Sequence, residues 1–179
     1  MNLANKLTFL RILMIPVFMV FALADIPHGN LFAASVFIVA SATDALDGYI
    51  ARKRKEITNM GKLLDPLADK LLVAAALISL VETGQIPSWI AVTIIGREFL
   101  VTGLRGLAAA DGMIIAASNL SKIKTITQII ALIILLLEDY FVGLLGFSPG
   151  DWVLYLALAF TVYTGLDYMI KTFARIRMT

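Results

Sequence analysis

Hydrophobic residues run along this chain in six long stretches, with short polar segments between them. The stretches cover residues 5–24, 31–52, 62–82, 88–110, 122–138 and 152–173. Each is close to the roughly 20 residues that an α-helix needs to cross a bilayer. Residues typical of turns, among them Pro27, Gly84 and Pro87, lie between several of the stretches. The pattern predicts six transmembrane helices in a single membrane domain that covers residues 1–179.

The composition indicates an all-α integral membrane protein. Of the 179 residues, 60% are hydrophobic and only 16% are charged, and the mean hydropathy is +0.89. Such a chain cannot cover its surface with polar groups as a soluble domain does. The absence of cysteine excludes a disulfide framework, a thiolate metal site and a cysteine nucleophile. The single histidine, His28, argues against a histidine-based zinc cluster, so oxygen atoms are the main metal ligands left.

The charged residues predict the orientation of the helices. If the amino terminus is cytoplasmic, all 15 Lys and Arg residues fall in the inner segments or at the inner ends of the helices. The outer turns carry no Lys or Arg but several acidic residues: Asp25, Glu82, Glu138, Asp139 and Asp151. Because cytoplasmic segments of membrane proteins are rich in Lys and Arg, we expect both termini to be cytoplasmic. The basic face would also attract anionic lipid headgroups and phosphorylated solutes.

The first hydrophobic stretch has some features of a cleavable signal peptide. Lys6 and Arg11 precede an apolar run that ends in the small residues of Ala22-Leu23-Ala24. Pro16 interrupts this run, however, and the chain begins at Met1. We therefore expect the stretch to be retained as the first transmembrane helix.

Four aspartates occur where the second hydrophobic stretch gives way to the third. Asp44 and Asp47 are three residues apart, and Asp65 and Asp69 are four apart, so each pair lies on one helix face. A charged residue at the centre of a membrane helix costs about 2.5–3.5 kcal/mol on insertion scales, so we expect a compensating interaction. Two antiparallel helices would bring the pairs together just inside the cytoplasmic interface.

Glycines beside the aspartates leave space for a ligand. Gly48 lies one turn after Asp44, and Gly61 lies one turn before Asp65 on the same stripe. Four carboxylates with oxygen-only partners suit two divalent ions, Mg²⁺ or Mn²⁺. Two ions about 3.5–4 Å apart can stabilise both the attacking and the leaving oxygen of a phosphoryl displacement. The aspartates therefore predict a two-metal site for phosphoryl transfer.

The segment from Asp44 to Asp69 has the form D-x-x-D-G-x-x-A-R-x8-G-x3-D-x3-D. It resembles, without a departure, the signature of the CDP-alcohol phosphotransferase family of membrane enzymes. Three further stretches, at 5–11, 96–105 and 121–125, are similar to the branch of the family whose acceptor is glycerol 3-phosphate. The resemblance implies six helices with the signature bridging the second and third, a homodimer, and a bacterial cytoplasmic membrane with the active site on the cytoplasmic side.

The resemblance also implies the reaction. The phosphatidyl group of CDP-diacylglycerol would pass to the hydroxyl of glycerol 3-phosphate, and CMP would leave. All four aspartates would be metal ligands, and Asp69 would in addition be the general base that takes the hydroxyl proton. Arg52 would bind a phosphate of the CDP group, and Gly48 and Ala51 would admit its cytidine. The CDP-binding residues expected on this basis are Asn5, Thr8, Gly48, Ala51, Arg52 and Gly61.

The acceptor phosphate needs its own basic site. Arg97 and Arg105 are eight residues apart, so they share a face of the fourth helix, and Lys122 and Lys124 lie where the fifth helix begins on the same side. An arginine matches phosphate bidentately, whereas a lysine acts as a point charge. We expect these four residues to bind the acceptor phosphate.

Each of these assignments has a structural alternative. The aspartates could pair with Arg52, Lys62 and Lys70 in an interfacial network. Arg97 and Arg105 could be interfacial anchors or partners of Glu98 and Asp111, and Lys122 and Lys124 could simply determine topology. Asn5, Thr8 and Arg11 could line the nucleotide pocket or cap the first helix, and a cap would be sufficient to explain Thr8.

Two other functional classes compete with the enzyme. Intramembrane carboxylates also mark the pathways of ion carriers, but here they cluster at one face and no inverted repeat is evident. A membrane scaffold would leave the aspartate signature unexplained. Within the enzyme reading, inositol phosphate, serine or a phospholipid could replace glycerol 3-phosphate, and no nucleic acid partner is expected. The sequence assigns no role to His28, Tyr163 or Asp167 and does not decide between the two metals.

Overall fold

The computed structural model describes the backbone of residues 3–54, 59–110 and 119–176 and the side chains of residues 5–43, 64–108 and 120–172. Within these ranges the chain forms seven α-helices and no β-strand. They are α1 (Leu3–Leu23), α2 (Gly29–Arg54), α3 (Asn59–Glu82), α4 (Ser88–Ala110), α5 (Asn119–Leu136), α6 (Glu138–Leu145) and α7 (Gly150–Ile176). The predicted all-helical class is confirmed, and every helix except α6 coincides with one predicted hydrophobic stretch.

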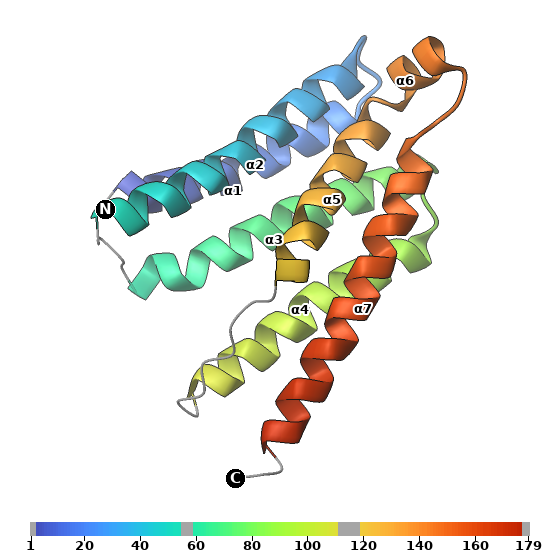
Figure 1. The fold of residues 1–179 in the computed structure, drawn as a ribbon. Coiled ribbons are helices and arrows are strands. Elements are labelled where there is room, and N and C mark those ends of the chain that lie inside the picture. The colour runs from blue at the N-terminus through green and yellow to red at the C-terminus, as the bar shows by residue number, and fades with distance from the viewer. Residues whose placement is uncertain (1–2, 55–58, 111–118, 177–179) are drawn as a thin grey trace.

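The six long helices alternate in direction along the chain (Figure 1). Figure 1 shows the α1–α2 turn, the α3–α4 turn and α6 at one end, which we call the α6 end. The start of α1 and the finish of α7 lie at the opposite end, where α2 also ends and α3 begins (Figure 1). α1 packs against α2 and α3, while α7 packs against α4 and α5. The aspartate signature therefore lies away from the α6 end.

Two helices are long and apolar enough by themselves to cross a membrane, in the segments Asn5–Leu23 and Gly150–Thr172. A third candidate is α5 taken together with α6, which are bent by 78° at the break between them. In α2 the described side chains, Gly29–Thr43, form a shorter apolar helix. α3 and α4 carry ionisable residues within their length, such as Asp69 and Arg97, and these lower their hydropathy. The described residues thus support two or three spans, and six spans remain a prediction.

The core consists of small and large apolar residues contributed by α1 to α5 and by α7. Phe18 of α1 and Phe37 of α2 are fully buried with their ring centroids 6.0 Å apart. The alanines at 74–76 of α3 are also buried within the chain. These small residues let α3 approach its neighbours closely, so they serve the packing of one subunit.

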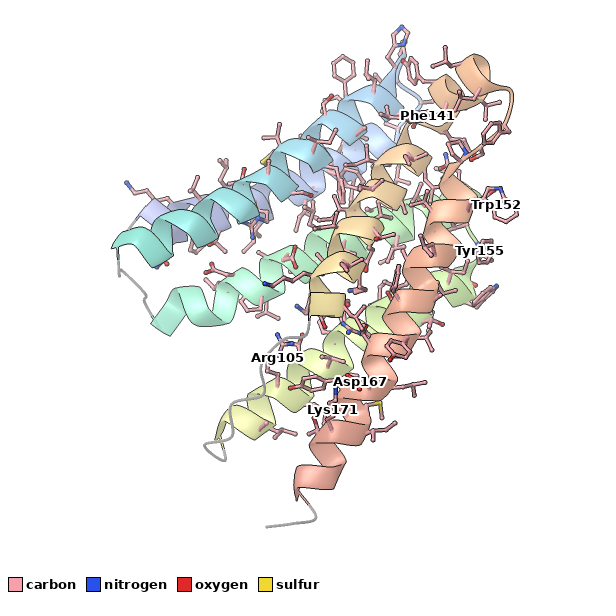
Figure 2. All side chains as sticks on the ribbon, viewed as in Figure 1. Arg105, Phe141, Trp152, Tyr155, Asp167 and Lys171 are labelled. Atoms are coloured by element: carbon pink, nitrogen blue, oxygen red, sulfur yellow. The ribbon has the colours of Figure 1, made fainter. Side chains whose placement is uncertain are left out.

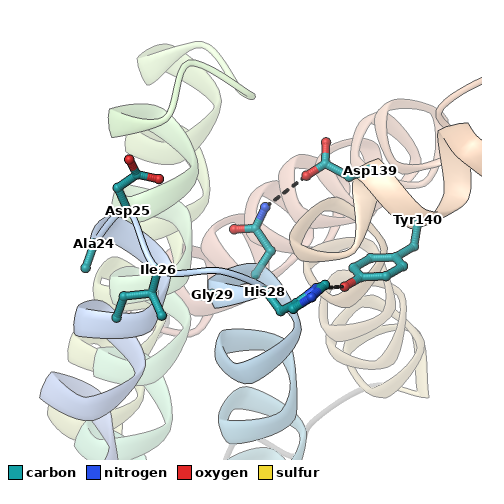
Figure 3. A pocket seen from close by; sticks show the side chains of 8 residues that line it. Ala24, Asp25, Ile26, His28, Gly29, Asp139 and Tyr140 are labelled. Atoms are coloured by element: carbon teal, nitrogen blue, oxygen red, sulfur yellow. Dashed lines mark hydrogen bonds between the residues drawn. The ribbon is translucent and has the colours of Figure 1, made fainter.

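α6 was not predicted, and a polar contact region connects it to the α1–α2 turn. Asn30 Nδ2 donates to Asp139 Oδ2 at 3.2 Å, and His28 Nδ1 lies 3.1 Å from the Tyr140 hydroxyl (Figure 3). His28 adopts a left-handed backbone conformation with φ 60°, which is uncommon for a residue with a side chain. No role was predicted for His28, and in the structure it helps to hold α6 at the end of the bundle opposite the aspartates.

Candidate active site

A hydrogen bond connects α1 to the aspartate stripe of α3. Thr8 is fully buried, and its Oγ1 donates to Asp65 Oδ1 at 2.5 Å. Asn5 and Arg11 are buried on the same face of α1. Thr8 is the sixth residue of α1 as described, whereas a cap precedes the first turn, so the capping interpretation of Thr8 is wrong. Its side chain instead orients a predicted metal ligand.

Asp65 and Asp69 lie one turn apart on α3 and are both partly buried. Their carboxylate oxygens are the donors that Mg²⁺ and Mn²⁺ prefer. Thr8 orients Asp65 in the way that outer-sphere hydrogen bonds commonly orient metal ligands. These two residues therefore suit a hard divalent ion, although no group of three acidic or histidine side chains with metal-binding geometry occurs among the described residues.

The rest of the signature lies on the neighbouring helix ends. Asp44, Asp47, Gly48, Ala51 and Arg52 belong to α2, and Gly61 belongs to the first turn of α3. Their side chains fall outside the described residues, as does Asp111, the predicted alternative partner of the arginines. The metal site and the CDP site accordingly remain predictions.

A cavity of about 730 Å³ opens beside Asp69, between α3, α4 and α5. Four basic side chains and two acidic ones line it: Lys70, Arg97, Arg105, Lys122, Asp69 and Glu98. Among the described lining residues, positive charge therefore exceeds negative charge by two, counting four cations against two carboxylates. Such an excess suits a phosphorylated ligand. The structure brings three of the predicted acceptor residues together with the predicted base.

A buried ionic network forms one wall of this cavity. Glu98 Oε1 accepts from Arg97 Nη1 at 2.9 Å and also forms an ion pair with Lys124 Nζ. Arg97 Nη2 donates to Thr164 Oγ1 of α7 at 2.8 Å. Both terminal nitrogens of Arg97 thus already have protein partners. Arg97 cannot turn both of them to a phosphate without leaving Glu98 or Thr164.

Lys124 differs from the other predicted acceptor residues. Its side chain is only 3% exposed and lies beside Glu98 in a small pocket that adjoins the large cavity. A lysine that only determined topology would keep its ammonium in water or at the headgroups. Lys124 is instead buried, and its charge balances Glu98 inside the protein.

Arg105 and Lys122 are the exposed cations of the cavity. The guanidinium carbon of Arg105 lies 5.6 Å from the centroid of the Tyr168 ring, a cation–π geometry that holds the side chain beside α7. Figure 2 shows Arg105 on α4 near the part of α7 that carries Asp167 and Lys171. Neither Arg105 nor Lys122 forms an ion pair with another described residue. They are the basic groups most readily available to a phosphate.

Comparison with known proteins identifies the family. Residues 1–163 match the family model described as CDP-alcohol phosphatidyltransferase. The chain is 47% identical over 188 residues to the CDP-diacylglycerol–glycerol-3-phosphate 3-phosphatidyltransferase of Bacillus subtilis (strain 168), covering 98% of this chain and 97% of that protein. A protein of the same name from Rickettsia bellii (strain RML369-C) is 39% identical, covering 93% of this chain and 93% of that protein. Another from Pseudomonas fluorescens is also 39% identical, covering 94% of this chain and 89% of that protein.

The chain belongs to the CDP-alcohol phosphatidyltransferase family. It is therefore a phosphatidyltransferase, and the resemblance seen in the aspartate signature is confirmed. Its phosphatidyltransferase relatives named above are bacterial. A membrane enzyme of phospholipid synthesis explains why the chain combines apolar helices with a polar cavity.

The sequence did not predict the polar residues of α5 and α7 that contact the arginines or line the small pocket. Thr164 and Tyr168 of α7 hold Arg97 and Arg105, and the buried Gln128 of α5 lines the small pocket with Asp69. Thr164 and Tyr168 are four residues apart, so they share one face of α7. That spacing is visible in the sequence, but only the packing of α7 against α4 connects it to the arginines. Asp167, also without a predicted role, forms an exposed ion pair with Lys171 at 2.7 Å.

Proposed function

We propose that the protein transfers the phosphatidyl group of CDP-diacylglycerol to glycerol 3-phosphate, giving phosphatidylglycerophosphate and CMP in a divalent-metal-dependent reaction. The observation that carries the proposal is the match over nearly the full length to relatives named for this activity. The position of Asp69 at the edge of a basic cavity supports it, because the base and the phosphate-binding groups must flank the same alcohol.

The proposed reaction assigns distinct tasks to the residues of α3 and α4. A hydroxyl of glycerol 3-phosphate attacks the phosphorus that bears diacylglycerol, and the bond from this phosphorus to the CMP oxygen breaks. Asp69 accepts the proton of the attacking hydroxyl. Arg105 and Lys122 hold the acceptor phosphate, which leaves the hydroxyl end of the acceptor directed towards Asp69 across the same cavity.

The donor would bind at the aspartate signature. Asp44, Asp47, Asp65 and Asp69 would hold two ions, Mg²⁺ or Mn²⁺, and Thr8 would keep Asp65 oriented. When bound, these ions would offset the charge of the pyrophosphate and make the attacking hydroxyl more acidic. Arg52 would bind a phosphate of the CDP group, with Asn5, Thr8, Gly48, Ala51 and Gly61 around the nucleotide.

The proposal places six spans in the bacterial cytoplasmic membrane, with the site on the cytoplasmic side. Large apolar side chains are exposed on α2, α3 and α4 as well as on the two helices apolar enough to span alone. Examples are Val39, Ile78 and Val92, which are 55%, 51% and 68% exposed. Exposed apolar surface on every long helix supports a bundle surrounded by lipid. The homodimer implied by the family stays part of the proposal.

Purified protein tests the reaction directly. Radiolabel should pass from glycerol 3-phosphate into lipid only when CDP-diacylglycerol and Mg²⁺ or Mn²⁺ are both present. EDTA should abolish the transfer, and an excess of the metal should restore it. Transfer that is unaffected by EDTA would remove the metal from the proposal while leaving the reaction.

An acceptor panel decides the alcohol. Glycerol 3-phosphate should be used in preference to inositol phosphate, serine and phosphatidylglycerol. If another acceptor is preferred, the same chemistry applies with a different substrate. If no acceptor is used while the protein moves divalent cations across a vesicle membrane, the carrier interpretation replaces the enzyme.

A further inference from the structure

A small pocket next to Asp69 contains two hydrogen-bond acceptors from α4 and α5, the Glu98 carboxylate and the Gln128 amide oxygen. It has a volume of about 20 Å³, and Asp69, Glu98 and Gln128 line it together with Lys70 and Lys124. A site needs about 10–15 Å³ to hold one water-sized group, so the pocket has room for a hydroxyl but not for a phosphate. It adjoins the large cavity, with which it shares Asp69, Lys70, Glu98 and Thr125.

Gln128 supplies an acceptor that lacks a donor. The residue is only 3% exposed, and its side-chain oxygen has no hydrogen-bond partner among the described residues. A buried amide oxygen without a partner costs stability, so such a group in a pocket wall points to a ligand or water that donates to it.

Glu98 lies in the same pocket with a fixed orientation. One of its oxygens is held by both Arg97 and Lys124, and Arg97 is held in turn by Thr164. An ionised carboxylate only accepts hydrogen bonds. It repels a phosphate but binds a hydroxyl, which can donate. Arg97 and Lys124 hold Glu98, and the exposed Arg105 and Lys122 remain for the phosphate.

On the basis of the proposed function, we infer that Glu98, together with Gln128, binds the hydroxyl of the acceptor that does not react. In glycerol 3-phosphate this is the secondary hydroxyl, while the primary hydroxyl attacks. Glu98 then determines specificity: it selects an alcohol phosphate that carries a second hydroxyl next to the reacting carbon. It does not take part in the bond-making step.

The decisive experiment compares two acceptors in several variants. Glycerol 3-phosphate and 3-hydroxypropyl phosphate share the phosphate and the primary hydroxyl, and the second lacks only the secondary hydroxyl. The wild-type protein should prefer glycerol 3-phosphate by roughly 10- to 100-fold in kcat/KM, the range expected for a hydrogen bond to a charged group. In Glu98→Gln this ratio should fall to within about threefold of one, mainly through lower activity with glycerol 3-phosphate.

Two further variants distinguish a loss of hydroxyl binding from a loss of the folded structure. Glu98→Asp retains the negative charge that balances Lys124 and Arg97 but shortens the side chain by one methylene, and it should also lower the ratio. Gln128→Met keeps the volume and removes the amide oxygen, with a smaller fall in the same direction. Arg105→Gln is the matched control, because it should weaken both acceptors by the same factor and leave the ratio unchanged.

The inference fails if the wild-type protein uses both acceptors equally well. It also fails if Glu98→Gln and Glu98→Asp lower the activity with both acceptors equally, since Glu98 would then only support Arg97 and Lys124. A wild-type protein that transfers to neither acceptor would instead overturn the proposed function, so the two failures are distinguishable.

Discussion

At the scale of single residues, Thr8 is informative because it connects a helix outside the aspartate signature to a residue within it. Its hydroxyl donates to Asp65 from a fully buried position. A threonine in this place would be unremarkable if it capped a helix or bonded only to its own backbone. The contact with a predicted metal ligand makes α1 part of the proposed site.

Thr8→Val tests this contact with almost no change in shape. The variant leaves one oxygen of Asp65 without its donor, and outer-sphere partners of metal ligands typically contribute 10–100-fold to affinity or activity. We expect the Mg²⁺ concentration for half-maximal activity to rise by roughly tenfold, with the KM for glycerol 3-phosphate unchanged. Thr8→Ser, which retains the hydroxyl, is the control. An unchanged metal requirement in Thr8→Val would separate Thr8 from the metal site.

Asp69 combines two predicted roles, as a base and as a metal ligand. Asp69→Asn keeps the size and removes the charge, so we expect kcat to fall by roughly 10²–10⁴-fold, the range for loss of a general base. Raising the pH should not restore the activity, because an amide does not ionise to a base. Lys171→Gln, which breaks only the exposed pair with Asp167, should leave kcat unchanged in the same assay. Activity of Asp69→Asn within threefold of wild type would contradict the assignment.

At the scale of helices, the sequence predicts the long elements well because their hydrophobic runs match the length of a membrane span. The stretch expected at 88–110 coincides with α4, and that at 122–138 differs from α5 by only a few residues. α6 was not predicted because it is short and begins with Glu138 and Asp139, which are typical of an outer turn. Its position depends on distant contacts with His28 and Asn30, which no local pattern reveals.

For the site, too, local sequence patterns predict which residues take part, whereas distant contacts determine their partners. The signature aspartates are recognisable because their spacing is regular, and Arg97 and Arg105 because they share a helix face. Which partner each cation takes depends on how α4, α5 and α7 pack. Glu98 could have paired with either arginine, and the structure shows it between Arg97 and Lys124. Burial of Lys124 likewise follows from tertiary packing and not from its position in the sequence.

The close packing of α7 against α4 gives a prediction about these two helices. A Cβ added at Gly165 would lie 2.9 Å from Cγ of Arg97, so Gly165→Ala must displace the Arg97 side chain. We expect the variant to lower the thermal midpoint, because overpacking costs about 1–3 kcal/mol of stability. We also expect a lower kcat/KM for glycerol 3-phosphate, because a displaced Arg97 no longer holds Glu98 at the cavity wall. Gly96→Ala is the control beside the same arginine, since nothing lies within 4 Å of its added Cβ. Equal behaviour of the two variants would show that Arg97 tolerates the displacement.

At the scale of the whole molecule, the number of spans decides where the site lies. Figure 1 places the α1–α2 turn, the α3–α4 turn and α6 at one end of the bundle. If all six long helices cross the membrane, these turns share one side, and the connections after α2 and α4 share the other with both termini. If only α1 and α7 cross, everything between them lies on a single side. The chain contains no cysteine, so single introduced cysteines can distinguish the two topologies.

Five positions suffice for the test in intact bacterial cells: Asp25, Thr58, Ser88, Ser118 and Thr179, each changed to Cys. With six spans and cytoplasmic termini, a membrane-impermeant maleimide should label the variants at Asp25 and Ser88 from outside. The other three should react only after permeabilisation, and the cysteine-free parent should not react at all. Labelling of Thr58→Cys and Ser118→Cys in intact cells would instead support two spans. This labelling would place the connection between α2 and α3 outside the cell. Neither CDP-diacylglycerol nor glycerol 3-phosphate made in the cytoplasm could then reach the aspartates.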